Sequence, residues 1–291
     1  MNSAASISIA ALVGLLSGTH TSIWGMYKDA LHEGFGLGRF GRSMIVGAAC
    51  AALIESWLLL PMDDAGALVL LFGLTYAAER GIVEVWKTFV RDEDQAKYFI
   101  PMQFSIRGRP VEHRGIRLAA GAAYVVVVAL CLGTIGLLDR TGPPDIFTIL
   151  LVGLAVGLIV AVGGGWKDAP KEGFDLVKFF RSPLMTVVWA VLLSRFTDST
   201  LLIAVGCIGF ERATAETYKT FFFPSKPRGK FTGKPVLFPD MLTRRQYFVP
   251  AYAAIWAVVI VTALVALRGV APPSVLQLDV PVPQPHAGTR P

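Results

Sequence analysis

The sequence predicts an all-α integral membrane protein of about eight transmembrane helices, arranged as two parallel four-helix repeats related by a pseudo-two-fold axis along the membrane normal. Three observations predict this class. Of the 291 residues, 54% are hydrophobic and only 16% are charged, the apolar residues gather in long runs, and charged motifs recur in the same order along the chain. A soluble domain carries about 25% charged residues, and the mean hydropathy here is +0.56. Water-soluble classes are therefore excluded.

Eight apolar runs are the candidate transmembrane helices, because each approaches the roughly 20 residues that cross a bilayer core. They cover residues 4–25, 43–61, 66–86, 116–138, 144–165, 182–199, 200–220 and 247–267. The sixth and seventh runs meet near Asp198 with almost no loop between them. The first basic residue is Lys28, so no basic segment precedes the first run and a cleaved signal peptide is not expected.

Basic residues concentrate on alternate loops. The loops after runs one, three, five and seven hold 21 of the 27 Lys and Arg residues, whereas the other loops are short and carry Asp63, Asp64, Asp139 and Asp198. The positive-inside rule therefore predicts that the basic loops are cytoplasmic and that both termini lie outside the cytoplasm. The net charge of +6 then reflects the basic cytoplasmic loops, and no nucleic-acid partner is expected. The Pro-rich tail at 271–291 is predicted to be disordered.

The chain contains an internal duplication. Residues 28–35, KDALHEGF, recur at 167–174 as KDAPKEGF, an offset of 139 residues that also aligns Ser43 with Ser182. A second match aligns residues 79–89 with 211–221, and a third aligns 108–111 with 233–236. Repeat 1 covers residues 1–140 and repeat 2 covers 141–270. Because each repeat has an even number of spans, both halves enter the membrane in the same direction, as in some transporters.

The first repeated motif is a pair of acids where runs one and five leave the membrane. Asp29 and Glu33 are four residues apart and share a helix face, as do Asp168 and Glu172. Carboxylates at this spacing can hold a divalent cation or a cation in transit. Gly34 and Gly173 are expected to end the helices. The competing interpretation is a headgroup anchor formed by Lys28 or Lys167 with a nearby tryptophan.

The second repeated motif lies on runs three and seven. Arg80, Glu84 and Lys87 form a stripe of alternating charge on one helix face, which favours a self-neutralising structural role. Glu79 and Glu211 lie about 100° away from the stripe and its copy, so they have no obvious local partner. They are the first candidates for chemistry, and we expect Glu79 to converge with Asp29 and Glu33, and Glu211 with Asp168 and Glu172.

These motifs define the candidate site. The candidate ion- or substrate-binding residues are Asp29, Glu33, Glu79, Asp168, Glu172 and Glu211, the supporting residues are Lys28, Arg80, Glu84, Lys167, Arg212 and Glu216, and the candidate metal ligands are Glu79 and Glu211. A divalent cation is the one cofactor that this residue set suggests. No catalytic residue is assigned. The basic, aromatic loops after runs three and seven favour membrane lipids with anionic headgroups as partners, and His20 is expected to be a hydrogen-bonded interior histidine.

Three functions remain open. The leading hypothesis is a transporter or channel for a cation or small solute, with symmetric acidic clusters at its cytoplasmic mouth. The alternative is a membrane-embedded, Mg-dependent enzyme acting on a lipid phosphate or prenyl diphosphate at the cytoplasmic face. The third is a non-catalytic accessory subunit of a membrane complex that docks protein partners on the cytoplasmic side. It predicts that the charged residues are paired internally and that no open cleft lies between the two halves.

Overall fold

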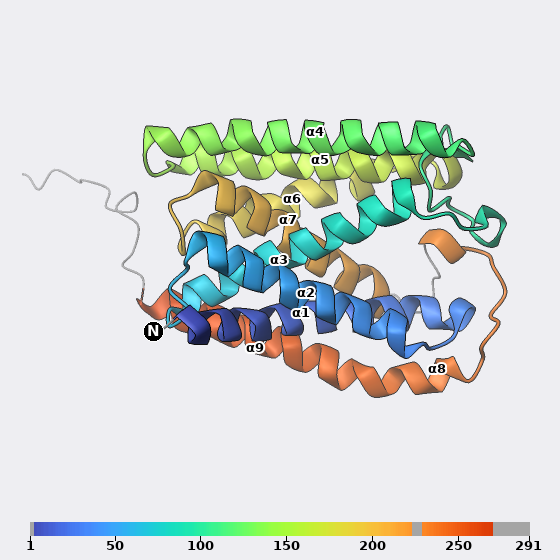
Figure 1. The fold of residues 1–291 in the computed structure, drawn as a ribbon, viewed down its shortest axis with the longest axis horizontal. Helices are drawn as coiled ribbons and strands as arrows, with labels where there is room; N and C mark the ends of the chain where they lie inside the picture. The colour runs from blue at the N-terminus through green and yellow to red at the C-terminus, as the bar shows by residue number, and fades with distance from the viewer. Residues whose placement is uncertain (1–2, 223–228, 270–291) are drawn as a thin grey trace, which may run out of the picture.

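The protein is an all-α bundle with short connections (Figure 1). The computed structural model describes residues 3–222 and 229–269, so the predicted tail at 271–291 lies outside the described residues. The long helices are α1 (Ser3–Glu33), α2 (Leu37–Leu58), α3 (Ala65–Val85), α4 (Arg114–Leu138), α5 (Ile146–Glu172), α6 (Leu176–Leu193), α7 (Thr200–Phe221) and α9 (Val249–Gly269). The shorter elements are a π-helical turn (Trp86–Val90) that continues α3, 3-10 turns at Gln95–Lys97, Asp139–Thr141, Gly229–Phe231 and Arg245–Phe248, strands β1 (Ser105–Ile106) and β2 (Arg109–Pro110), and helix α8 (Met241–Arg244).

Seven helices in the described ranges are long and apolar enough to cross a membrane. They are α1, α2, α3 with its π-helical turn, α4, α5, α6 and the segment Met241–Gly269. The seventh predicted run also forms a helix, α7, but α7 is not in this set. It carries Glu211, Arg212, Glu216 and Lys219 within its 22 residues, which lowers its hydropathy. The membrane class is therefore supported, and an eighth span at α7 stays a prediction.

Helices α1 and α5 run seven to eight residues beyond the apolar runs and end at the predicted glycines. The Gly34 N–H donates to the Ala30 carbonyl over 3.0 Å, and the Gly173 N–H donates to the Ala169 carbonyl over 2.9 Å. Both glycines have positive φ angles, +68° and +82°, which residues with a Cβ adopt at a cost. The predicted ends at Gly34 and Gly173 are confirmed.

Small side chains hold α1 against α2 and α5 against α6. A Cβ on Gly18 would lie 2.2 Å from the Ser43 carbonyl oxygen, and one on Gly157 would lie 2.5 Å from the Pro183 Cα. Gly14 and Gly153 lie one turn earlier in each helix, and a Cβ there would lie 2.3 Å from the Gly47 carbonyl oxygen and 2.9 Å from the Val187 Cα. Helices in a bilayer pack closely where glycine lets their backbones approach. These two helix pairs therefore pack tightly along matching faces.

Helices α3 and α7 form the centre of the bundle (Figure 1). They meet at Gly209, where an added Cβ would lie 1.9 Å from the Gly73 carbonyl oxygen. Helix α9 packs against α1 and α3, whereas α4 packs against α7 and the π-helical turn. The last helix of each half of the chain thus contacts the third helix of the other half.

The described parts of the four basic loops lie at one end of the bundle, which we call the basic end, and the N-terminal end of α1 lies at the opposite end (Figure 1). The loops cross between the halves. The Trp166 indole N–H of α5 donates to the Ser105 carbonyl over 3.2 Å, and the Leu237 and Phe238 N–H groups donate to the Leu31 carbonyl of α1 over 2.9 and 3.0 Å. The assignment of the basic end to the cytoplasm stays a prediction of the positive-inside rule.

Candidate functional site

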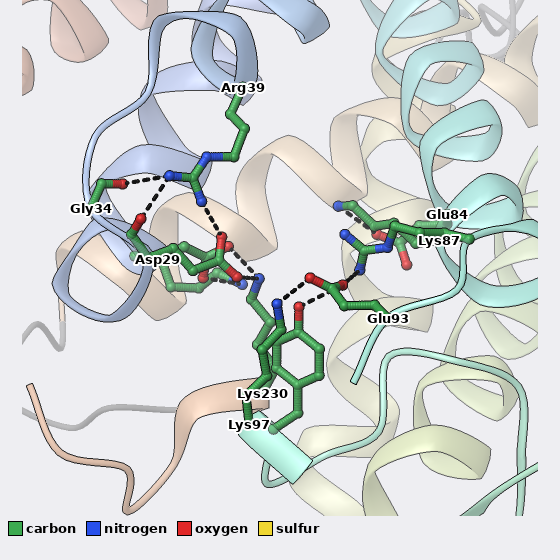
Figure 2. A network of polar contacts seen from close by, with 12 residues as sticks. Asp29, Gly34, Arg39, Glu84, Lys87, Glu93, Lys97 and Lys230 are labelled. Atoms are coloured by element: carbon green, nitrogen blue, oxygen red, sulfur yellow. Dashed lines mark hydrogen bonds and ion pairs between the residues drawn. The ribbon is translucent and has the colours of Figure 1, made fainter. Parts of the chain in front are cut away.

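The acids at the end of α1 are bridged by a lysine from the other half of the chain. Lys230 Nζ lies 3.0 Å from a carboxylate oxygen of Asp29 and 3.0 Å from one of Glu33 (Figure 2). Arg39 donates to the second oxygen of Glu33 over 3.1 Å and to the Glu33 and Gly34 carbonyls. Asp29 also lies 3.3 Å from its neighbour Lys28. The predicted shared face of Asp29 and Glu33 is confirmed, and an ammonium group occupies the space between them.

The acids at the end of α5 are bridged in the same manner. Lys178 Nζ lies 3.4 Å from Asp168 and 2.6 Å from Glu172. Lys178 is the residue that the 139-residue offset aligns with Arg39. Lys167 does not join this cluster, because its ammonium lies 3.7 Å from Glu84 of α3. Both Asp-x-x-x-Glu pairs are therefore held as internal ion pairs.

Electrostatics at the basic end favour the charged form of Lys230. Burial alone would lower the pKa of its ammonium, but Asp29 and Glu33 outweigh burial and raise the pKa above the ordinary 10.5. In the loop after α3, burial tends to raise the pKa of Glu93, but Lys97 and Tyr98 together with Arg91 lower it. Figure 2 shows both clusters facing each other, with Glu93 and Lys97 on one side and Asp29 on the other. The loops at this end are thus fixed by charge pairs.

Lys230→Gln is expected to destabilise the protein by about 2 kcal/mol at pH 7, because Asp29 and Glu33 lose a charged hydrogen-bond donor. A raised pKa in the folded state means that this contribution is present below the unfolded pKa and is lost as pH rises through the folded value. Thermal unfolding of wild type and variant should therefore differ at pH 7 and converge above pH 10.5. Lys178→Gln is the matched control, with a smaller loss because Lys178 is more exposed. Equal stability of Lys230→Gln and wild type at pH 7 would contradict the bridge.

The charged stripe on α3 is confirmed as a self-neutralising structure. Arg80 donates to Glu84 over 2.8 Å, and Lys87 lies 3.8 Å from the same carboxylate. Arg80 also reaches Glu216 of α7 over 3.3 Å, and the Tyr76 hydroxyl donates to Glu216 over 2.5 Å. The stripe therefore ties α3 to α7.

The copy of the stripe on α7 is arranged differently. Arg212 lies 3.4 Å from Glu211, its neighbour in sequence, while Glu216 is bound by α3. In the described residues Arg212 and Glu216 therefore do not repeat the Arg80–Glu84 pair as the copy of the stripe predicts, because Glu216 is 6% exposed and pairs with Arg80 at the interface with α3.

Glu79 and Glu211 are the two most deeply buried carboxylates of the candidate site, with exposures of 0 and 1%. The Ser182 hydroxyl of α6 donates to Glu211 over 2.6 Å. Ser43 of α2 lies beside Glu79, but neither Glu79 oxygen accepts a hydrogen bond of good geometry from a described residue. Each carboxylate thus faces a serine on the second helix of its own half.

The predicted convergence of Glu79 with Asp29 and Glu33 is not found. Asp29 and Glu33 are bridged by Lys230 at the end of α1, whereas Glu79 faces Ser43 inside the bundle. The described residues contain no group of three or more His, Cys, Asp or Glu placed to hold a metal ion. Glu211 likewise faces Ser182, and Asp168 and Glu172 are bridged by Lys178, so the second predicted cluster is not found either. The physical reason is that an ammonium group already lies between the two acids of each pair.

His20 lies at the middle of α1 and is fully buried, as predicted, but it is not hydrogen-bonded to any described residue. Its ring stacks on Tyr252 of α9 at 4.1 Å and meets the edges of Trp256 and Tyr76 at 5.3 and 5.4 Å. The expectation of a hydrogen-bonded histidine is therefore wrong, because aromatic side chains surround this ring.

Sequence reasoning missed the partners of these acids. Ser43 and Ser182 did match at the offset of 139 residues, so the signal for the serines was present. Lys230 gave no such signal, because it is 197 residues from Glu33 and only the crossed loops bring the two together.

Comparison of the chain with protein-family models, curated proteins and solved structures finds no match.

Proposed function

We propose that this protein is a membrane transporter or channel for a cation, and that Glu79 and Glu211 bind the cation. The observation that carries the proposal is the burial of these two carboxylates, at 0 and 1% exposure, inside the central helices α3 and α7. An acidic side chain placed within a membrane costs about 2.5–3.5 kcal/mol on insertion scales. Such groups most often mark ion pathways, which supports transport over a purely structural role.

The equivalence of the two halves supports a two-fold pathway. Under the duplication, Ser43 with Glu79 corresponds to Ser182 with Glu211, and the glycines that pack α1 on α2 correspond to those that pack α5 on α6. The acid pairs bridged by lysine recur as well. These matches favour two parallel repeats, residues 1–140 and 141–270, about an axis along the membrane normal.

The ligands favour a proton or a monovalent cation over a divalent metal. Each carboxylate has one serine hydroxyl beside it, and Glu211 also lies 3.4 Å from Arg212, whereas Ca²⁺ takes about 6–8 oxygen ligands and Mg²⁺ requires near-octahedral coordination. A single carboxylate can take up a proton or pass a weakly held ion without a complete cage. The candidate metal ligands are therefore proposed as ion-transfer groups.

The test is ion flux into liposomes that contain the purified protein. In the double variant Glu79→Gln, Glu211→Gln, the flux of H⁺, Na⁺ or K⁺ is expected to fall at least about tenfold, because glutamine keeps the shape of glutamate but cannot carry its charge. Each single variant should lower the flux as well, because each half of the chain contributes one of the two carboxylates. Glu93→Gln in the loop is the control and should retain flux. Full flux in the double variant would contradict the proposal.

An accessory subunit is the second candidate, and the internal pairing at the basic end favours it. Asp29, Glu33, Asp168 and Glu172 all have a basic partner within 3.4 Å, as this function predicts. The same liposomes separate the two candidates. If wild-type protein gives no flux above empty liposomes for any of the three ions, the transporter fails and the accessory subunit is favoured.

A further inference from the structure

An apolar groove lies between the end of α3 and the first turns of α4. Its volume is about 410 Å³, and its walls are Val85, Phe89 and Val90 on one side and Leu118, Ala122 and Val125 on the other. These residues belong to two helices that are long and apolar enough to cross a membrane. The groove therefore faces the lipid at the level of the basic end.

One close contact joins the two walls of this groove. A Cβ on Gly121 of α4 would lie 2.7 Å from the Phe89 Cβ, so only glycine permits this approach. Phe89 lies in the π-helical turn Trp86–Val90, a local widening that often accompanies functional sites. The contact fixes α4 beside the end of α3, and Val125, in the next turn of α4, is 49% exposed.

The depth of the groove matches one leaflet of a bilayer. At 1.5 Å per residue, the helix from Leu118 to Val126 is about 12 Å long, and half of a bilayer core is about 15 Å thick. Both residues line the groove. Its length therefore suits an acyl chain that enters from the basic end and stops near the middle of the membrane.

An exposed arginine precedes the groove by one helical turn, since Arg114 is four residues before the lining residue Leu118. Arg114, the first residue of α4, has a side chain that is 66% exposed and lies 4.0 Å from Asp92, at the limit of an ion pair. Asp92 itself is bound by Arg117, and Glu93 by Arg91. Asp92 is thus held at closer range by Arg117 than by Arg114, and the exposed guanidinium of Arg114 is accessible to a headgroup phosphate.

We propose that this groove binds an acyl chain of an anionic phospholipid whose headgroup phosphate contacts Arg114. In a bilayer an apolar groove gains little from excluding water, because the competing lipid tails are equally apolar. The acyl chain is therefore held by the shape of the groove. The preference for one lipid over another comes from the charge of its headgroup. This binding site does not depend on the proposed transport of a cation.

The test is native mass spectrometry of the full chain released from nanodiscs of equal parts phosphatidylglycerol and phosphatidylcholine. Wild type is expected to retain at least one lipid and to prefer phosphatidylglycerol. Arg114→Gln should keep the lipid but lower this preference about fivefold, the effect of one basic residue near a membrane surface. Arg140→Gln at the opposite end is the control for charge and should retain the preference.

A larger side chain in the groove should displace the lipid. Ala122→Phe is expected to lose the retained lipid, whereas Val127→Phe, on the neighbouring exposed face of α4, should keep it. Val125→Phe is a second filling variant at a position already 49% exposed, so a folding defect in Ala122→Phe does not end the test. Lipid retention in both filling variants, or an unchanged preference in Arg114→Gln, would overturn the proposal.

Discussion

Gly209→Ala is expected to separate α7 from α3 and to destabilise the protein by about 3 kcal/mol, the upper part of the usual range for overpacking. The new Cβ would lie 1.9 Å from the Gly73 carbonyl oxygen, 2.8 Å from its carbonyl carbon and 3.0 Å from the Ala77 nitrogen. All three atoms belong to the backbone of α3. Because no side chain can rotate away, the two central helices must move apart, and every contact between them weakens.

The measurement is the midpoint of thermal unfolding in one detergent at one heating rate, since unfolding of such proteins is often irreversible. Gly81→Ala is the matched control on α3, where an added Cβ meets nothing within 4 Å. Alanine forms helices better than glycine, so this control should be as stable as wild type or slightly more so. If Gly209→Ala unfolds at the same temperature as Gly81→Ala, the backbones of α3 and α7 are not in contact.

Arg80→Gln is expected to cost about 3–5 kcal/mol, the range for removing one partner of a buried ion pair. The side chain is 11% exposed, binds Glu84 and Glu216, and lies over the Trp24 ring at 5.0 Å. Its loss leaves Glu216, on a different helix, as an uncompensated carboxylate between α3 and α7. The damage comes from that unpaired charge more than from the lost attraction.

A double variant separates these two causes. Arg80→Gln, Glu216→Gln should recover part of the lost stability, because no lone carboxylate remains at the interface. Arg244→Gln removes an arginine whose partner Asp240 is largely exposed, and should leave the unfolding midpoint unchanged. If the double variant recovers no stability, Arg80 stabilises the protein through Trp24 or Glu84 instead of through Glu216.

The helices were predictable from sequence where the signal is local. Runs of apolar residues located the eight long helices of the described residues, and Gly34 and Gly173 marked the ends of α1 and α5, because a positive φ angle depends only on the residues nearby. The starts of several helices are also set by residues nearby in the sequence. Asp64, Asp145 and Ser199 accept the N–H of the third residue that follows, as capping residues do.

The candidate site was predictable only in part, because its partners come from distant segments. The stripe formed by Arg80 and Glu84 is one helical turn long and was correctly interpreted. The lysine that bridges Asp29 and Glu33 was not, since no periodicity links residue 29 to residue 230. The serines beside Glu79 and Glu211 fall between these cases, because the duplication marked them without indicating what they touch.

The crossed loops bear on how the chain is made. Asp29 and Glu33 leave the ribosome long before Lys230, which is 197 residues after Glu33. At about 5–20 residues per second, translation takes roughly 10 to 40 s to supply that lysine. During this interval the end of α1 has Arg39 and Lys28 but not its bridging ammonium. Biogenesis of the first half therefore cannot finish until synthesis of the second is almost complete.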